Sequence, residues 1–280
     1  MPLVAAFLVP GSPLHYLRPD VAPWAPLARA HTRAAAALAA ARPDVLIVYS
    51  TQWIAVLDEL WQLRPRVQGL HVDENWYDFG DLPFDMRIDT ELASACIAAS
   101  AQIGVRSKGV DYDGFPIDTG TIVANGFLNP DGRMPLVIAA NNVYHDWQRT
   151  EHLGALAAAQ AERLARRYAL IGVGGLSGTI FREEIDLETD RIASAADDSA
   201  NRELLEALTG ADGTQLRTAC AEYAGKVRAD MGLKHLAFVL GGLGSRYAGA
   251  TTLGYGPSYG SGAAVIEFKV SGQTGRRGEA

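Results

Sequence analysis

The sequence predicts an α/β fold, a three-layer α/β/α sandwich around a mostly parallel or mixed sheet. The apolar run at 45–49, mostly β-branched or aromatic, has the pattern of a strand buried on both faces. An alanine-rich segment of high helical propensity at 27–41 ends just ahead of it, before Pro43. A polar loop then leaves the strand, at the edge where open α/β sheets place their ligand sites.

The other elements follow in order along the chain. We expect strands at 3–9, 134–140, 168–172 and 263–268, a short strand and turn at 109–118, and helices at 89–103, 150–167, 201–210 and 214–231. The aromatic and acidic residues 71–83 have no periodicity, which predicts a long ordered loop. Residues 182–191 carry seven charges, which indicates a solvated surface. We find no repeat or linker and therefore predict one domain at 1–270, with a disordered tail at 271–280.

Composition limits the class of protein. The 280 residues are 48% hydrophobic and 20% charged, which is ordinary for a soluble globular chain. The net charge of -7 and the lack of a basic patch argue against nucleic acid. Cys96 and Cys220 form no C-x-x-C pair, which fits a reduced cytoplasm. No apolar run reaches the roughly 18 residues needed to span a bilayer, and the apolar N-terminus is interpreted as a strand.

A glycine-rich segment, the histidines and an acidic segment are each considered as possible sites of another function. Residues 172–178 follow a predicted strand but do not match G-x-G-x-x-G, and around Ser177 they only approach a G-x-S-x-G nucleophile elbow, since Thr179 replaces the last glycine. A glycine-rich turn is the simpler interpretation. The six histidines form no metal-binding spacing, although His145 follows a strand and is the best placed for a pocket. The carboxylates of 73–81 lack EF-hand spacing, which favours a solvated loop.

Several loops that leave predicted strands carry a family resemblance. They are 6–14, 44–53, 77–80, 139–144, 172–177 and 254–262. In order and spacing they resemble the class III extradiol dioxygenases, the family of protocatechuate 4,5-dioxygenase, over nearly the whole chain. Within it the sequence is most similar to the α subunits of the 2-aminophenol 1,6-dioxygenases. The resemblance implies the α/β/α fold stated above.

Active members of that family hold Fe(II) with two histidines and one carboxylate, and use a further histidine for proton transfer. Here Gly11 and Gln52 stand at the two histidine-ligand positions, Asp113 replaces a pocket histidine, and Gly178 replaces the acid–base histidine. Asp230 is the only carboxylate near the third ligand position. Glycine has no donor atom and glutamine offers a weak neutral one. We therefore expect no catalytic residue, cofactor or metal in this chain. The degenerate pocket positions would be Gly11, Ser12, Gln52, Asp113, Asn142, His145 and Gly178.

The resemblance implies a non-catalytic α subunit that supports a homologous, iron-bearing β subunit, in an α2β2 enzyme that cleaves 2-aminophenol or a related aromatic. We expect Fe(II) in that partner, and neither nucleic acid nor membrane as a partner. Two alternatives remain open. One is a metal-independent enzyme with a site rebuilt from Ser12, Gln52, Asp113, Asn142, His145 and Ser177. The other is a stand-alone binding protein for a small aromatic. The glycine- and tyrosine-rich segment 254–262 is a candidate interface, with a tight core loop as the equal alternative.

Overall fold

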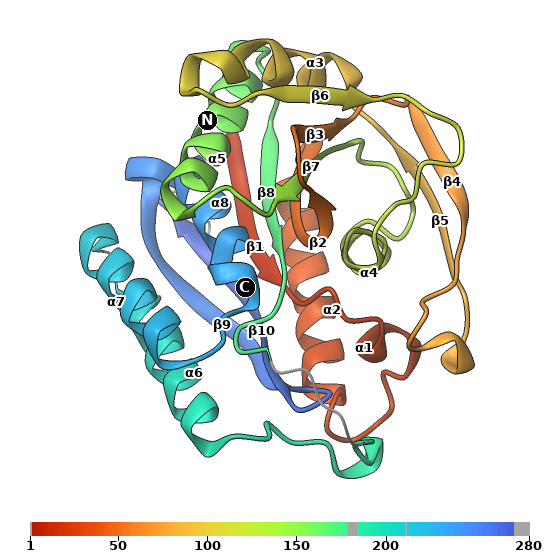
Figure 1. Cartoon of the computed structure of the whole chain (residues 1–280), viewed down its shortest axis with the longest axis vertical. Coiled ribbons are helices and arrows are strands. Elements are labelled where there is room, and N and C mark those ends of the chain that lie inside the picture. The colour runs from red at the N-terminus through yellow and green to blue at the C-terminus, as the bar shows by residue number, and fades with distance from the viewer. Residues whose placement is uncertain (1, 179–183, 211, 272–280) are drawn as a thin grey trace, which may run out of the picture.

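The computed structural model describes residues 2–178, 184–210 and 212–271. Eight strands of these residues form one sheet in the order β6-β3-β7-β2-β8-β1-β10-β9, and β4 and β5 form a separate hairpin (Figure 1). The strands are β1 (Leu3–Val9), β2 (Val45–Ala55), β3 (Glu59–Gln62), β4 (Arg66–His71), β5 (Leu82–Arg87), β6 (Ser107–Val110), β7 (Leu136–Asn142), β8 (Tyr168–Val173), β9 (Tyr247–Ser258) and β10 (Ser261–Val270).

The sheet is mixed, as predicted. Its central strands β7, β2, β8 and β1 run parallel, so their carboxyl ends meet at one edge. At one side β10 pairs antiparallel with β1, and β9 pairs antiparallel with β10. At the other side β3 is antiparallel to β7, and β6 is parallel to β3. The parallel centre places several strand-end loops side by side, and it is there that a ligand site is expected.

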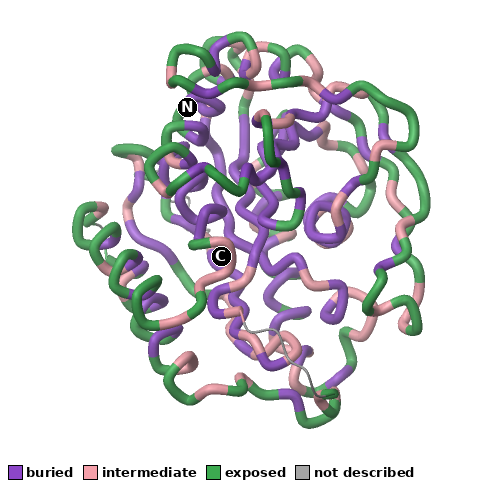
Figure 2. Tube along the Cα trace, viewed as in Figure 1, coloured by how far each residue is buried: buried purple, intermediate pink, exposed green. Residues whose placement is uncertain are grey.

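Helices cover both faces of the sheet, which completes the three layers. The helices are α1 (Leu14–Leu17), α2 (Ala25–Ala41), α3 (Thr90–Ala99), α4 (Thr119–Leu128), α5 (Trp147–Arg163), α6 (Ala195–Ala207), α7 (Gly213–Lys226) and α8 (Lys234–Leu243). Helices α2 and α4 pack on one face, and α3, α5 and α8 pack on the other. The tube drawing shows that the sheet and the inner sides of these helices are buried (Figure 2). None of the helices in the described ranges has the length and hydropathy needed to cross a membrane.

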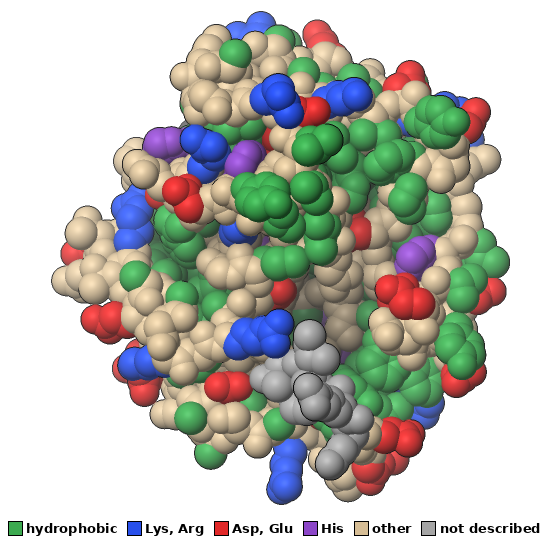
Figure 3. All heavy atoms as spheres, in the orientation of Figure 1, with side chains coloured by type: hydrophobic (Ala, Val, Ile, Leu, Met, Phe, Trp, Pro, Cys, Tyr) green, Lys and Arg blue, Asp and Glu red, His purple; other side chains and the backbone are tan. Residues whose placement is uncertain are grey.

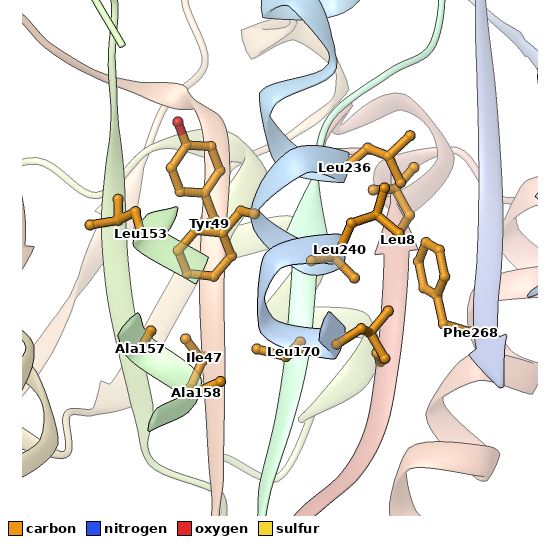
Figure 4. Packing of buried hydrophobic residues seen from close by; sticks show 14 of the residues in the cluster. Leu8, Ile47, Tyr49, Leu153, Ala157, Ala158, Leu170, Leu236, Leu240 and Phe268 are labelled. Carbon is orange, nitrogen blue, oxygen red and sulfur yellow. The ribbon is translucent and has the colours of Figure 1, made fainter. Parts of the chain in front are cut away.

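Alternation along the strands divides the core into two clusters. Phe7 and Val48 point toward α2 and α4. Leu8 and Tyr49, one residue further on, point toward α5 and α8. Figure 4 shows this second cluster, in which Leu8, Ile47, Tyr49 and Leu170 of the sheet meet Leu153, Ala157 and Ala158 of α5 and Leu236 and Leu240 of α8. A strand with both faces covered needs apolar residues at every position, which is the pattern the sequence shows.

Several elements differ from the sequence-based prediction. Strand β2 continues past Tyr49 to Ala55, so Gln52 lies within the strand. The prediction missed β3, the β4–β5 hairpin, β9, α4 and α8. Helix α7 ends at Lys226, short of the predicted 231, because Val227 takes an extended conformation (φ -132°, ψ 163°). Further on, Met231, Gly232 and Leu233 take positive φ angles of 43°, 65° and 58°, which an α-helix cannot accommodate. The disordered tail that we predict at 271–280 lies outside the described residues except for Ser271, and the single domain at 1–270 remains a prediction.

Candidate functional site

A cleft of about 680 Å³ opens at the carboxyl ends of the parallel strands. Ser12 follows β1, Gln52 belongs to β2, and Asp230 belongs to a short 3-10 turn, Asp230–Leu233, that enters α8. The segment after β4 and the N-terminus of α4 close the opposite wall. The lining includes His71, four carboxylic side chains and the aromatic residues Trp53, Trp76 and Tyr259, and no Lys or Arg of the described chain. The carboxylic side chains are Asp73, Glu74, Asp118 and Asp230. This wall would repel an anion.

Position 11, which the resemblance matches to the first histidine ligand, is closed by packing. A Cβ atom on Gly11 would lie 2.8 Å from Gly120 Cα and 2.9 Å from Val173 Cγ1, closer than such contacts allow. The Gln52 side chain lies against the same spot, where its Nε2 donates a hydrogen bond to the Gly11 carbonyl oxygen over 3.3 Å. Backbone and an amide therefore occupy the space where two imidazoles would need to converge.

Asp230 is the one acidic side chain at the expected ligand position, and it is already engaged. Its Oδ2 accepts hydrogen bonds from Thr51 Oγ1 at 3.0 Å and from the Gly175 amide at 2.7 Å. The positive φ angles of the next three residues turn the chain there and hold Asp230 at the cleft. Buried His235 lies behind it, and burial lowers the pKa of this imidazole, although the nearby Asp230 carboxylate acts in the opposite direction.

The donor set does not fit iron. Within the described residues, no group of three or more His, Cys, Asp or Glu side chains lies close enough to hold a metal ion. Position 11 offers no side chain and no room for one, and position 52 offers an amide. Iron(II) in oxygenases of this type needs two imidazoles and a carboxylate on one face with open positions opposite. We therefore derive no chemical step through a metal in this chain.

Restoring the missing histidines by substitution should fail. We expect Gly11→His to destabilise the chain by about 2 kcal/mol or more, because the new side chain collides with backbone at Gly120. Gln52→His, at the exposed cleft mouth, should cost about 1 kcal/mol for one lost hydrogen bond. Urea unfolding measures both, and anaerobic iron loading of the double variant measures affinity. Stoichiometric iron in a double variant of unchanged stability would contradict this account of Gly11.

The other degenerate positions do not converge on the cleft. Asp113 is exposed, pairs with Arg64, and lines a neighbouring groove. The Gly178 amide donates a hydrogen bond to the Arg228 carbonyl oxygen over 2.8 Å. A Cβ atom at this position would fit without a clash. Asn142 and His145 belong to a buried polar cluster below the β7 exit loop. The structure thus brings Gly11, Ser12 and Gln52 together and separates the rest of the predicted set from them.

That buried cluster joins His145, Glu59 and Lys234. His145 Nδ1 lies 3.4 Å from Glu59 Oε2, and Lys234 Nζ donates to the carbonyl oxygens of Asn142 and Val143 at 2.8 and 3.2 Å. Burial raises the pKa of Glu59 well above its usual value, with Lys234 opposing the shift, and burial lowers the pKa of His145 to about 4. The contacts of Glu59, His145 and Lys234 are consistent with a cluster that supports the β7 exit loop.

Sequence reasoning missed three hydrogen-bonded residues on the cleft wall. Thr119 Oγ1 lies 2.7 Å from His71 Nε2 and donates to Asp73 Oδ2 over 3.0 Å. Asp73 Oδ1 also accepts the amides of Asn75 and Trp76, so this carboxylate shapes its own loop. The contact joins the loop after β4 to the start of α4. The prediction has a loop at 71–83 but neither the β4–β5 hairpin nor α4, so no sequence pattern could have brought the three residues together.

Ser177, considered as a nucleophile, is buried and fully engaged. Its Oγ accepts hydrogen bonds from Asn201 Nδ2 at 3.0 Å and from the Gly262 amide at 3.1 Å. Asn201 in turn accepts a hydrogen bond from Tyr223 at 2.6 Å. The serine therefore joins α6 and β10 behind the loop, and the glycine-rich turn is the interpretation that fits.

The fold and this cleft define a class: an α/β protein with a cleft at the ends of its parallel strands, similar to the extradiol enzymes, with Gly11 and Gln52 at the positions that the resemblance matches to their histidine ligands. The chain belongs to the family described as the catalytic LigB subunit of aromatic ring-opening dioxygenase, whose model matches residues 6–265. This confirms the resemblance inferred from the sequence.

Individual relatives refine the placement within the family. A 2-aminophenol 1,6-dioxygenase alpha subunit from Pseudomonas sp. is 48% identical over 271 residues, 96% of this chain and 100% of that protein. A 2-aminophenol 1,6-dioxygenase beta subunit from Pseudomonas sp. is 30% identical over 168 residues, 58% of this chain and 55% of that protein. An uncharacterised Escherichia coli K12 protein, JW3007, shares the fold with a TM-score of 0.67 at 14% identity, covering 94% of this chain and 99% of that one.

Proposed function

We propose that this chain is the non-catalytic α subunit of a two-subunit extradiol dioxygenase acting on 2-aminophenol or a related aromatic. The observation that carries the proposal is the 48% identity to an alpha subunit of that name over the full length of the relative. The closed position at Gly11 and the amide of Gln52 support it, because neither offers an imidazole at the positions that the resemblance matches to the histidine ligands. The chemistry then belongs to a partner that keeps the histidines.

In this proposal the partner is a homologous β subunit that binds Fe(II), and the complex is α2β2. The enzyme opens the aromatic ring between the hydroxyl-bearing carbon and its unsubstituted neighbour, consuming O2 and yielding a product of the 2-aminomuconate semialdehyde type. This chain contributes folding support and an interface. The two buried, unpaired cysteines are consistent with a cytoplasmic location.

Iron content and ring-opening activity test the proposal. The chain is purified alone and, separately, after co-expression with a homologous β subunit, and both samples are loaded with Fe(II) under anaerobic conditions. We expect neither iron nor turnover of 2-aminophenol from the chain alone, and both from a co-purifying complex. Stoichiometric iron with turnover by the isolated chain would overturn the proposal, as would failure of the two chains to associate.

The alternatives receive less support. A rebuilt metal-independent site needs Asp113 and His145 in one buried pocket, whereas Asp113 is exposed and His145 faces Glu59. A binding function for a small aromatic has one observation in its favour, since the cleft is open and Trp53 and Trp76 line it. A calorimetric titration of the isolated chain with 2-aminophenol separates binding in the cleft from a purely supporting role.

A further inference from the structure

The large hydrophobic residues that are exposed gather around the mouth of the cleft. Five of them form one patch at the ends of β2 and β7, which we call the rim patch: Ile54, Val56, Leu57, Val143 and Tyr144. The two segments are joined by the register of Ala55 with Asn142 and by a hydrogen bond from the Val143 amide to the Ala55 carbonyl oxygen. Figure 3 shows hydrophobic side chains beside the hollow of the cleft on this face.

The remaining exposed large hydrophobics of the described chain continue the same rim. Leu70 and Val72 flank His71, Tyr77 follows Trp76, and both His71 and Trp76 line the cleft. Tyr112 lines the adjoining groove together with His71. Leu57 and Tyr144 are 80% and 77% exposed. Exposed apolar surface of several hundred Å² that is bordered by polar residues often marks a site of interaction.

The area of this surface matches what a stable interface needs. Nine side chains, each offering about 100 Å² when fully exposed and about half of that here, present roughly 500 Å² of apolar surface. A standard interface removes about 800 Å² from each partner, and about 65% of its core is apolar. Charged groups border the patch, among them the Arg106–Asp58 ion pair beside Leu57. An apolar centre inside a polar border is the usual composition of a protein interface.

Charge decides which occupant fits. Two copies of this chain meeting rim to rim would bring two acidic clefts face to face, each lined by four carboxylic side chains without a lysine or arginine of the described residues. Like charges opposed across an interface are unfavourable. A homologous subunit has the same fold, so it can present an equivalent rim about a pseudo-twofold axis without repeating this acidic lining.

We infer that the rim patch and the cleft mouth are the surface on which the homologous iron-bearing subunit docks. This inference rests on the proposed function, which supplies the partner, and adds where it binds. The docked subunit closes the cleft of this chain. The segment 254–262, the alternative interface, forms the end of β9, the turn and the start of β10. Gly254 lies against the backbone of Pro26 within α2, and Gly256 lies against the backbone of Pro23 ahead of that helix.

Cysteine labelling tests the inference directly. Cys96 and Cys220 are buried, and burial raises the pKa of each thiol to about 12. The two native cysteines should therefore react only slowly with a maleimide. Leu57→Cys and Tyr144→Cys place reactive thiols on the rim patch. Ala159→Cys on the exposed side of α5 is a control, and Thr251→Cys on the edge strand β9 reports on the alternative interface. Each variant is labelled alone and in the co-purified complex.

We expect labelling at positions 57 and 144 to slow at least tenfold in the complex and labelling at 159 and 251 to stay unchanged. Equal rates at 57 and 144 in the two samples would overturn the inference while leaving the proposed function intact. Protection at 251 alone would place the partner on β9. Protection of 57 and 144 in the isolated chain at high concentration would make the occupant a second copy. If the wild-type chain forms no complex, the proposed function fails first and this inference fails with it.

Discussion

Replacing Gly154 with alanine should destabilise this chain by about 3 kcal/mol or more, because α5 and α8 pack with their backbones in contact. A Cβ atom on Gly154 would lie 1.9 Å from the Phe238 carbonyl oxygen. The contact is reciprocal, since a Cβ atom on Gly241 of α8 would lie 1.9 Å from the Glu151 carbonyl oxygen of α5. Either substitution must push the two helices apart. That movement opens the cluster in which Tyr49 stacks on Phe238 at a centroid distance of 4.8 Å.

A glycine on another helix provides the matched control. Gly225 lies in α7, is exposed, and has no heavy atom within 4 Å of its virtual Cβ. Gly225→Ala should therefore stabilise the chain by about 0.5–1 kcal/mol, since alanine favours helix and nothing obstructs it. Urea unfolding followed by circular dichroism measures all three variants. A Gly154→Ala variant within 1 kcal/mol of the wild type would show that the helices can separate at little cost.

These glycines also show where sequence reasoning stops. The segment 234–243 has two glycines, which lower helical propensity, and after Lys234 and His235 it is a short apolar run that does not distinguish a helix from a strand. It is helical because it is buried between the sheet and α5, so tertiary packing and not local sequence determines its structure. The segment 119–128 is similar, with glycine and β-branched residues of weak helical propensity, and its start is marked by Asp118, whose side chain accepts the Thr121 amide.

The central strands, by contrast, could be predicted because a strand covered on both faces shows itself as a continuous apolar run. The strand at 45–49 is an example, and the other central parallel strands, β1, β7 and β8, are fully buried too. Edge elements lack this signal. Strand β9 has exposed threonines at 251 and 252 and several glycines, and β3 has only four residues. Local composition resembles a loop in both cases, and pairing with a neighbour makes them strands.

The same limit applies to the site. The positions Gly11, Ser12 and Gln52 could be placed together because each follows or ends a parallel strand, and such ends share one edge. Asp113 follows the edge strand β6, so it lies away from the centre of the sheet. His145 follows the central strand β7, but its side chain faces Glu59 of β3, which runs antiparallel to β7, and strand order alone does not show this. His71, Asp73 and Thr119 meet through a hairpin and a helix that the sequence did not reveal.

Buried histidines should make the chain sensitive to mild acid. His15 and His31 are both fully buried, with ring centroids 6.3 Å apart, and His31 stacks on Phe127 at 4.0 Å. Burial lowers the pKa of His15 from 6.5 to about 3, with repulsion from His31 as the second cause. Burial likewise lowers the pKa of His31 to about 4. Both rings are neutral in the folded chain at pH 5, whereas in the unfolded chain both are protonated.

The sign of the effect follows from proton binding. A histidine whose folded pKa is lowered leaves stability intact above pH 6.5 and removes it as the pH falls toward the folded pKa, because only the unfolded state takes up the proton. Between pH 7.5 and pH 5, His15 and His31 should each lower the free energy of unfolding by about 2 kcal/mol. Glu59 acts in the opposite direction, since its raised pKa favours the folded state at lower pH.

The contribution of the pair is therefore measured as a difference between variants. We expect the double variant His15→Leu and His31→Leu to lose about 4 kcal/mol less stability than the wild type when the pH falls from 7.5 to 5, because Glu59 contributes equally to both proteins. His152→Leu, on the exposed side of α5, is the matched control for the removal of an imidazole. Urea unfolding at each pH gives the values. Parallel pH profiles of the wild type and the double variant would mean that both rings accept protons inside the folded chain, which their burial beside Trp24 and Phe127 opposes.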